Sequence, residues 1–490
     1  MVFKKASGKR SLAPDHDGHR MDASTVFRLA SSSKLITIIA VLQAVDKGLI
    51  GLDDDVSPIL PTLAKQEVLT GFRWYGKPVT KPREGPITLR HLVTNTAGTG
   101  YDFLPIQPLW RWRWWHGQKI GGNQDRGRGW SIDDSLDYPL LHEPGRGWTY
   151  GSGASWAGRV LETLSGMSLD DWIREHINAP LGLSTLTFFP QRDPAIAARV
   201  AAMNRRDYWT AKVLDCQDEP GVNSFSDGSD DNNVCLGGEG LYSSLEDFLE
   251  VLHSLLADDE RLLSKALTAE MFSPQAREGG GGLEELRQCL GLPCWISQGI
   301  LKKGEFNWGI GGVLIDGDGH DYLKRGSLMW SGLYHLLWVS DPLLFLLHGR
   351  ERVMLTLPAK QWMDREAGVC GIFGAQLVPA ADKTVISTIK AFQKEVYRIL
   401  DLMNDNGEVK DVGKAEQQNA GGPGNGPLAK LARAGKDITV QVGVLEVLLT
   451  LPIGSDGVPS SWAAQCDSNA ASSSSLVSFL TWVLKLWRRA

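Results

Sequence analysis

A nearly continuous apolar pattern follows the first thirty or so positions of the chain, at residues 35–47. Apolar side chains there lie nearly all round a helix, at Leu35, Ile36, Ile38, Ile39, Val41, Leu42 and Val45. A helix without a polar face is buried in a protein interior. The pattern therefore predicts a buried helix over 35–47, and residues 31–34 lie at its start, at the mouth of a dry core.

Two later patterns predict elements of a different kind. Residues 143–158 run from a Pro-Gly turn through an aromatic pair to a glycine-punctuated helix start, with Tyr150 at the junction. Residues 322–339 become rich in aromatic and aliphatic side chains, which is typical of a β-strand. Gly332 lies in this strand, where a glycine often marks the close approach of a ligand to the backbone.

Ser31 and Lys34 are three residues apart at the start of the apolar helix. Residues with this spacing share a helix face, so the hydroxyl and the amine can hydrogen-bond. A serine becomes a good nucleophile when a neighbouring base takes its proton, and burial favours the neutral form of lysine that such a base requires. The pair predicts an activated serine, although a serine-rich helix start without catalytic function has the same pattern.

Tyr150 and Gly332 each have a catalytic and an ordinary interpretation. A phenol beside an ammonium group can relay a proton, but a tyrosine can also pack under a turn. Backbone N–H groups near Gly332 can face a tetrahedral oxyanion, but the same glycine can form a bulge in an ordinary strand. The order of the three motifs along the chain favours the catalytic interpretation of each.

The three motifs, in this order and with these gaps, resemble the serine β-lactamase-like superfamily. The chain is most similar to its esterase and acyltransferase branch, typified by the lovastatin-type acyltransferases of fungal polyketide pathways. Residues 87–98, 237–244 and 307–312 look like further signatures of this family. The resemblance covers residues from about 6 to 400.

The resemblance implies a role for each site residue. Ser31 would be the acylated nucleophile, Lys34 its activating base and Tyr150 a proton relay, although the resemblance leaves open which of Lys34 and Tyr150 is the base. The backbone N–H groups of Ser31 and Leu333 would form the oxyanion hole. Trp330 would stand where lactamases keep a lysine, beside Gly332 in the substrate-binding wall.

Departures from the lactamase pattern narrow the expected substrate. Ser152 stands where penicillin-recognising relatives carry an asparagine, and Trp330-Ser331-Gly332 replaces their Lys-Thr-Gly. A β-lactam carboxylate requires a cation, whereas Trp330 offers an indole face and one N–H donor. We therefore expect a neutral ester or thioester whose acyl group passes through acyl-Ser31 to an alcohol or to water.

The fold class implied by the resemblance is α+β, serine β-lactamase/transpeptidase-like. A twisted antiparallel sheet, built from an N-terminal remnant and residues 295–375, would be flanked by helices including 35–47 and 385–400. A mostly helical domain at about 75–285 would cover the sheet. The active site would lie in the crevice between them.

The expected domain organisation is one β-lactamase-related catalytic domain over 1–400 and an extension over 401–490. Residues 413–427 are rich in Gly, Asn, Gln and Lys, so the extension is predicted to be low-complexity or disordered. Residues 364–374 look like the strand that follows Gly332. Residues 342–363 between them are predicted to be an insert, either a retained intron or a lid, and their composition favours the intron.

Residues 109–116 interleave tryptophans with arginines. Aromatic and arginine side chains are typical of binding surfaces, so this segment predicts a wall for a polycyclic acceptor or a docking face for an acyl-carrier domain of a polyketide synthase. The alternative is a helix with tryptophans in the core and arginines extending outward.

Composition agrees with a large enzyme and excludes other classes. The chain has 490 residues, 42% hydrophobic, with 18 Trp and a formal net charge of −6, so nucleic-acid binding is not expected. No clear membrane span and no secretory signal are visible. The six cysteines show no metal-ligand or disulfide-framework spacing, so we expect no metal, no cofactor and a cytoplasmic location.

Three functional hypotheses follow. The first is an acyltransferase that moves a short acyl group from a small-molecule thioester to the hydroxyl of a polyketide-like secondary metabolite. The second is a carboxylesterase that hydrolyses small esters with the same residues. The third is an inactive truncated copy, suggested by the short segment before Ser31, by 342–363 and by the tail.

Overall fold

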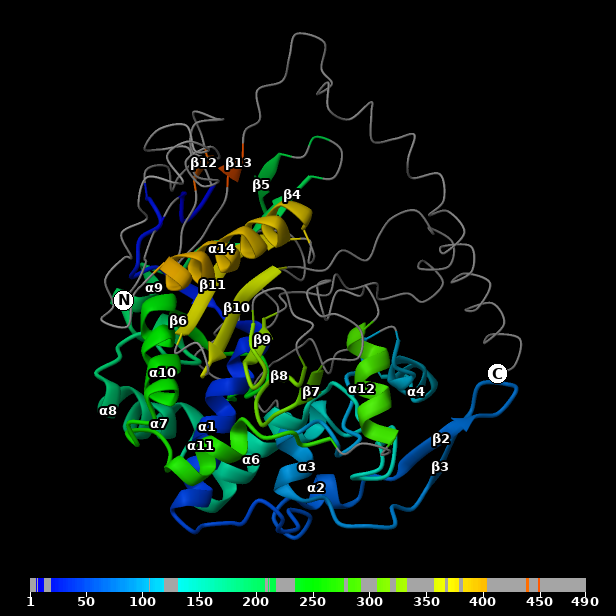
Figure 1. Ribbon diagram of the computed structural model, residues 1–490. Coiled ribbons are helices and arrows are strands. Elements are labelled where there is room, and N and C mark those ends of the chain that lie inside the picture. The colour runs from blue at the N-terminus through cyan, green and yellow to red at the C-terminus, as the bar shows by residue number, and fades with distance from the viewer. Residues whose placement is uncertain are drawn as a thin grey trace, which may run out of the picture.

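The computed structural model in Figure 1 places a twisted sheet and a group of helices around one central helix. The structure describes residues 6, 8–12, 19–104, 106–118, 131–207, 210, 212–216, 234–276, 281–291, 306–317, 323–332, 357–365, 369–378, 382–402, 438–439 and 448–449. Leu333 and the predicted linker at 413–427 lie outside the described residues.

The main sheet has seven strands in the order β5-β4-β11-β10-β9-β8-β7. Neighbouring strands are antiparallel, except that β4 runs parallel to β11. The strands are β4 (Asn204–Arg206), β5 (Val213–Asp215), β7 (Phe306–Trp308), β8 (Val313–Ile315), β9 (Leu328–Ser331), β10 (Leu357–Asp364) and β11 (Val369–Val378).

Two details of this sheet differ from the sequence-based expectations. Residues 357–363, assigned to an insert, form most of β10, which pairs with β9 on one side and β11 on the other. The strand beyond β11 is β4 and not an N-terminal remnant, since Asn204 pairs with Leu377. A strand that is paired on both sides alternates its side chains between two buried faces, and this made β10 difficult to separate from an apolar insert.

Helices cover both faces of the sheet (Figure 1). Trp362 and Phe373 pack with Phe392 of α14 (Lys383–Leu402) on one face. Their neighbours Met363 and Ile372 belong to the core that contains α1 (Ser33–Asp46) and α10 (Leu245–Ala257) on the other. Adjacent strand residues thus point to opposite faces, as pleating requires.

The predicted buried helix is confirmed by α1. All its residues from Ser33 to Ala44 are buried. The predicted helix at 385–400 corresponds to α14, in which Val385, Ile389, Phe392 and Val396 form the apolar stripe. No described helix is both long and apolar enough to cross a bilayer.

The region 75–285 contains most of the remaining helices. A projecting hairpin lies at its start. The hairpin pairs β2 (Val68–Phe72) with β3 (Pro78–Lys81), and β1 (Val26–Arg28) pairs with β6 (Tyr242–Ser244). The other elements are η2 (Ala30–Ser32), α2 (Pro61–Ala64), α3 (Leu89–Val93), α4 (Leu109–Trp115), α5 (Ile132–Ser135), α6 (Gly153–Ser165), α7 (Leu169–Ile173), η3 (Arg174–Asn178), α8 (Ala179–Leu181), η4 (Pro190–Arg192), α9 (Pro194–Ala197), α11 (Lys265–Met271), α12 (Gly281–Gly291), β12 (Ile438–Thr439) and β13 (Leu448–Leu449).

Candidate active site

Ser31 lies in the short helical turn η2, between strand β1 and helix α1. The residue before it, Ala30, has φ of 47°, in the left-handed region that side chains other than glycine seldom adopt. Such backbone strain persists where the surrounding structure fixes it, and it is concentrated at functional sites. The turn therefore holds the Ser31 hydroxyl in a defined position at the start of the buried helix.

The Lys34 amine has three oxygen partners in a nearly dry environment. Its Nζ lies 3.2 Å from Ser31 Oγ, 3.0 Å from the Tyr101 hydroxyl and 2.7 Å from the Gly238 carbonyl oxygen. The Lys34 residue is 3% exposed. The amine thus lies within hydrogen-bond distance of the Ser31 hydroxyl while it also contacts Tyr101 and Gly238, which fixes its position beside the serine.

The loop at 237–240 is shaped to receive the lysine. The Thr37 hydroxyl donates to the Gly237 carbonyl at 2.7 Å, and the Gly238 N–H donates to Ser155 Oγ at 3.1 Å. A Cβ at Gly238 would lie 3.0 Å from the Tyr101 hydroxyl oxygen and 3.4 Å from Lys34 Nζ. The glycine therefore allows the carbonyl to approach the amine closely, which explains the glycine-rich sequence of this signature.

Tyr150 is close to Lys34, but through its ring. The ring centroid lies 4.9 Å from Lys34 Nζ. Its buried hydroxyl has no hydrogen-bond partner among the described residues. Because buried polar groups are nearly always paired, an orphan hydroxyl at this place indicates a position that a ligand fills.

The phenol that bonds to Lys34 is Tyr101, which the sequence analysis did not identify. Burial raises the pKa of Tyr101 well above its ordinary value, and Glu239, Tyr150 and Tyr138 add to the effect. The phenol therefore stays protonated near neutral pH and is a fixed hydrogen-bond partner of the amine. The signal available in the sequence was its place three residues after Gly98, at the end of the 87–98 signature.

Gln107 fixes the two tyrosine segments relative to each other. Its Oε1 accepts from the Tyr101 N–H at 2.6 Å, and its Nε2 donates to the Tyr150 carbonyl at 2.8 Å. Both bonds are buried, so water cannot replace them. Gln107 thus sets the separation of Tyr101 and Tyr150 on either side of the lysine.

Trp330 lies on β9 in a wall of aromatic side chains. Its ring centroid is 5.2 Å from that of Tyr150 and 4.9 Å from that of Trp308, and Trp308 is 5.3 Å from Trp148. The indole nitrogens of these three tryptophans are buried without a partner among the described residues. The wall therefore offers neutral N–H donors, and this suits an uncharged oxygen or sulfur function better than a carboxylate.

Gly332 lies against the backbone of the turn that holds Ser31, whereas its position in the strand predicted the approach of a ligand. A Cβ there would lie 2.1 Å from the Leu29 carbonyl oxygen and 3.2 Å from Ser32 Oγ. A side chain at 332 would therefore push the end of β9 away from the turn that holds Ser31. Leu333, the other predicted oxyanion-hole residue, lies outside the described residues.

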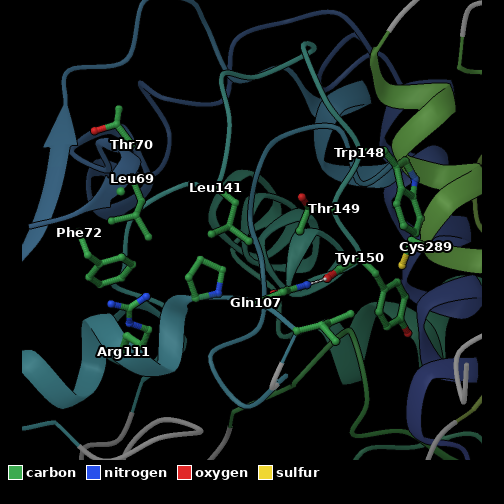
Figure 2. Close-up of a pocket in the computed structure, with 13 residues that line it drawn as sticks. Leu69, Thr70, Phe72, Gln107, Arg111, Leu141, Trp148, Thr149, Tyr150 and Cys289 are labelled. Atoms are coloured by element: carbon green, nitrogen blue, oxygen red, sulfur yellow. Dashed lines mark hydrogen bonds between the residues drawn. The ribbon is translucent and has the colours of Figure 1, made fainter. Parts of the chain in front are cut away.

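A pocket of about 430 Å³ leads away from Tyr150 (Figure 2). Tyr150, Trp148 and Cys289 line one end, and Phe72 and Arg111 lie at the opposite end, with Gln107 between them. The other lining residues are Leu69, Thr70, Gly71, Ile106, Pro108, Leu141 and Thr149. The pocket is thus mostly apolar and has room for a small organic molecule.

The Beta-lactamase family model matches residues 2–342 of this sequence. The chain belongs to the Beta-lactamase family. The superfamily resemblance that the three motifs carried is therefore confirmed, and so is the α+β, β-lactamase/transpeptidase-like fold class.

Relatives of this Beta-lactamase family member lie in its esterase and acyltransferase branch. It is 31% identical over 408 residues to the lovastatin esterase of Penicillium rubens, covering 81% of this chain and 91% of that protein. It is 31% identical over 405 residues to the monacolin J acid methylbutanoyltransferase of Aspergillus terreus, covering 81% and 88%.

Among solved structures, a simvastatin synthase mutant (LovD6) from Aspergillus terreus superposes with a TM-score of 0.66 at 30% identity. The match covers 80% of this chain and 86% of that one. EstCE1, a hydrolase with promiscuous acyltransferase activity, superposes with a TM-score of 0.53 at 20% identity and supports the fold. The sequence comparisons and the structural comparisons therefore both indicate the Beta-lactamase fold.

Helix α4 agrees only in part with the core-helix interpretation of 109–116, since Trp112 packs against the core but other side chains do not follow it. Arg113 is buried, and its Nε lies 2.9 Å from Asp102 Oδ2 in a pair whose side chains are each 4% exposed. Trp114 and Trp115 are exposed instead, at 59% and 37%. The arginine is held inside by a carboxylate, a contact that a reading of the helix alone did not anticipate.

The described residues contain no group of three or more His, Cys, Asp or Glu side chains placed to hold a metal ion. The chemistry at hand is instead that of the Ser31 hydroxyl, the Lys34 amine and two phenols. This set is suited to acyl transfer through a serine, for which proton transfer and a preorganised oxyanion site suffice.

Proposed function

We propose that this protein is an acyltransferase that moves a short acyl group from a thioester, through acyl-Ser31, to the hydroxyl of a polyketide-like secondary metabolite. The observation that carries the proposal is the buried Lys34 amine 3.2 Å from Ser31 Oγ, with its other two bonds taken by Tyr101 and Gly238. This arrangement supplies the base that a serine nucleophile requires.

In the first half-reaction, Ser31 Oγ attacks the thioester carbonyl and its proton passes to the neutral Lys34 amine. The carbon–sulfur bond then breaks, and the thiol leaves with that proton. In the second half-reaction, the acceptor hydroxyl attacks acyl-Ser31, its proton passes to Lys34, and Ser31 recovers a proton as the new ester leaves. Tyr150 would relay protons between the amine and the leaving or attacking atom, because its hydroxyl has no partner in the described part of the chain.

The tetrahedral oxyanion would be held by the backbone N–H groups of Ser31 and Leu333. Support comes from Gly332, which allows the end of β9 to approach Leu29 and the turn of Ser31. Ser31 also lies just before the first turn of α1, where the helix dipole stabilises developing negative charge.

The site favours neutral acyl donors over β-lactams. Trp330 occupies the place where lactamases keep a lysine, and its indole is buried against Tyr150 and Trp308. A β-lactam carboxylate would meet no cation at this wall, whereas a thioester needs none. The named acyltransferase relatives point to the same reaction class.

An acyl-carrier domain of a polyketide synthase is the larger donor that we propose. A group of exposed aromatic residues lies on α4 and at the tip of the β2–β3 hairpin, beside the pocket: Trp74, Tyr75, Trp114 and Trp115. Phe72, on the same hairpin, lines the pocket itself. A carrier docked on these aromatic residues would present its thioester at the mouth of the pocket.

A cytoplasmic location and the domain extents are also part of the proposal. Cys235 and Cys370 of the described part form no disulfide, as expected in a reducing compartment. The catalytic domain would extend to about residue 400, where α14 closes the sheet, and 401–490 would be the extension.

The esterase hypothesis uses the same residues with water as the acceptor. The similarity to the lovastatin esterase of Penicillium rubens supports it. The mostly apolar pocket beside Tyr150 favours an organic acceptor. The complete network around Lys34 argues against an inactive copy, since a chain released from selection has no reason to keep four buried groups in register.

The test separates transfer from hydrolysis. The protein is incubated with a butanoyl thioester of N-acetylcysteamine, with and without a large hydrophobic secondary alcohol, and products are followed by chromatography. We expect ester formation to exceed acid formation when the alcohol is present. Acid as the sole product, at a rate that the alcohol does not alter, would establish the esterase. No turnover by a folded sample would overturn both.

A further inference from the structure

Helix α4 carries two arginines with different environments. Arg113 faces the interior and is paired with Asp102. Arg111 is two residues earlier, so it points to a different side of the helix and lines the pocket. Helix α4 therefore carries one arginine that is buried in an ion pair and one that is accessible to a ligand in the pocket.

Arg111 is the one charged side chain among the lining residues of the pocket. Its guanidinium lies 4.0 Å from the centroid of the Phe72 ring. Among the described residues no carboxylate pairs with it, and burial lowers its pKa with no charged neighbour as a cause. Guanidinium groups remain charged at neutral pH, so the pocket contains an uncompensated cation.

We infer that Arg111 is the anchor for an anionic group, a carboxylate or a phosphate, on a substrate that occupies this pocket. The guanidinium carbon lies over the Phe72 ring, and a guanidinium can make a bidentate contact with two oxygens of an anion. Tyr150 lies at the opposite end of the pocket (Figure 2). A ligand held at Arg111 would therefore extend its uncharged end toward Tyr150 and Ser31.

The location of the charge agrees with the neutral wall around Trp330. That wall binds the acyl function through N–H groups, and the cation is kept at the far end of the pocket. Specificity for an anion would then come from Arg111, away from the reacting carbonyl. The inference depends on the proposed function in one respect, namely which substrate carries the anion. That substrate is either an acceptor with a carboxylate or a donor with the phosphate of its pantetheine arm.

Binding tests the inference without any turnover. The Ser31→Ala protein is titrated by calorimetry with decanoate and with decanol, and with 4′-phosphopantetheine and with pantetheine. The same titrations are made after adding Arg111→Gln. The matched control carries Arg73→Gln instead. Arg73 is an exposed cation of the β2–β3 hairpin, next to Phe72, and does not line the pocket.

Because a hydrogen bond to a charged group contributes about 1.5–3 kcal/mol, Arg111→Gln should weaken one anionic ligand about 10- to 100-fold. Its neutral counterpart should bind as before, and Arg73→Gln should change neither. A loss confined to decanoate assigns the anion to the acceptor, and a loss confined to phosphopantetheine assigns it to the donor. The inference would be overturned if each of the four ligands bound with the same affinity before and after Arg111→Gln, in a protein with an unchanged thermal transition.

Failure of this test and failure of the proposed function are distinguishable. Acylation of Ser31 by an N-acetylcysteamine thioester involves no anionic group, so it reports on the catalytic centre alone. Anion binding at Arg111 with no acylation would leave a binding pocket without the proposed reaction. Acylation without anion dependence would leave the reaction and remove the anchor.

Discussion

The two phenols beside Lys34 predict different effects on stability and on rate when their hydroxyls are removed. In Tyr101→Phe, the ring can remain stacked on Phe103, at 4.6 Å between centroids, so little packing is lost. The lost hydroxyl is 3.0 Å from the Nζ of Lys34, a residue that is 3% exposed, and water cannot readily replace it there. In Tyr150→Phe, the lost hydroxyl is one that bonds to none of the residues that the structure describes.

The magnitudes follow from these contacts. Leaving a buried donor without its partner costs about 1–3 kcal/mol, so Tyr101→Phe should lower the free energy of unfolding by about that amount. The lysine would also be held less firmly, and about 1.4 kcal/mol in the barrier is tenfold in the acylation rate. Tyr150→Phe should leave stability nearly unchanged, but loss of a proton relay should lower the acylation rate about 10²- to 10⁴-fold.

Two assays on the same preparations separate the effects. Urea unfolding gives the free energy of unfolding, and stopped-flow release of thiol from an acyl thioester gives the acylation rate. The raised pKa of Tyr101 also predicts that the wild-type rate shows no inflection from this phenol below about pH 10. The reasoning is refuted if Tyr150→Phe destabilises the protein as much as Tyr101→Phe does and leaves the acylation rate at the wild-type value.

Three further predictions concern other parts of the site and the core. Arg113→Met should destabilise the protein by about 3–5 kcal/mol in urea unfolding, because Asp102 would remain buried without its partner, and an unchanged midpoint would contradict this. Trp330→Lys should bind an anionic thioester more tightly than the wild type does in steady-state kinetics, and equal KM values would speak against the proposed role of the tryptophan. Burial raises the pKa of Cys370 to about 12, so this thiol should resist iodoacetamide at pH 8 in the native protein, as peptide mapping would show, and rapid native labelling would exclude the packing described.

The sequence predicted the parts of the fold that depend on local pattern. The buried helix at 35–47 needed only its all-round apolar composition, whereas the helix at 385–400, which is α14, was expected from the family resemblance. The sheet was less predictable, because β10 lies in a segment assigned to an insert, contains Lys360 and Gln361 beside its apolar residues, and has partner strands on both sides. Strand β4 joins β11 through residues far apart in the chain, a contact that no local pattern encodes.

The residues of the candidate site also fall into two groups, those that a local pattern predicts and those whose roles depend on the fold. Ser31 and Lys34 could be paired from their spacing, since three residues is a local separation on a helix. Tyr101 and Gly238 meet Lys34 from distant segments, so their roles depend on the fold. The burial of Arg113 had the same cause, since its partner Asp102 lies in a loop that the helix pattern does not describe.

The most direct test of the acyl-Ser31 mechanism is intact-mass spectrometry after brief exposure to a butanoyl thioester, with the wild type and Ser31→Ala measured in parallel. The mechanism predicts one added acyl group on the wild type and none on Ser31→Ala, with Lys34→Ala also unmodified on that time scale. An equal adduct on Ser31→Ala, or an adduct on Lys34→Ala formed at the wild-type rate, would contradict it.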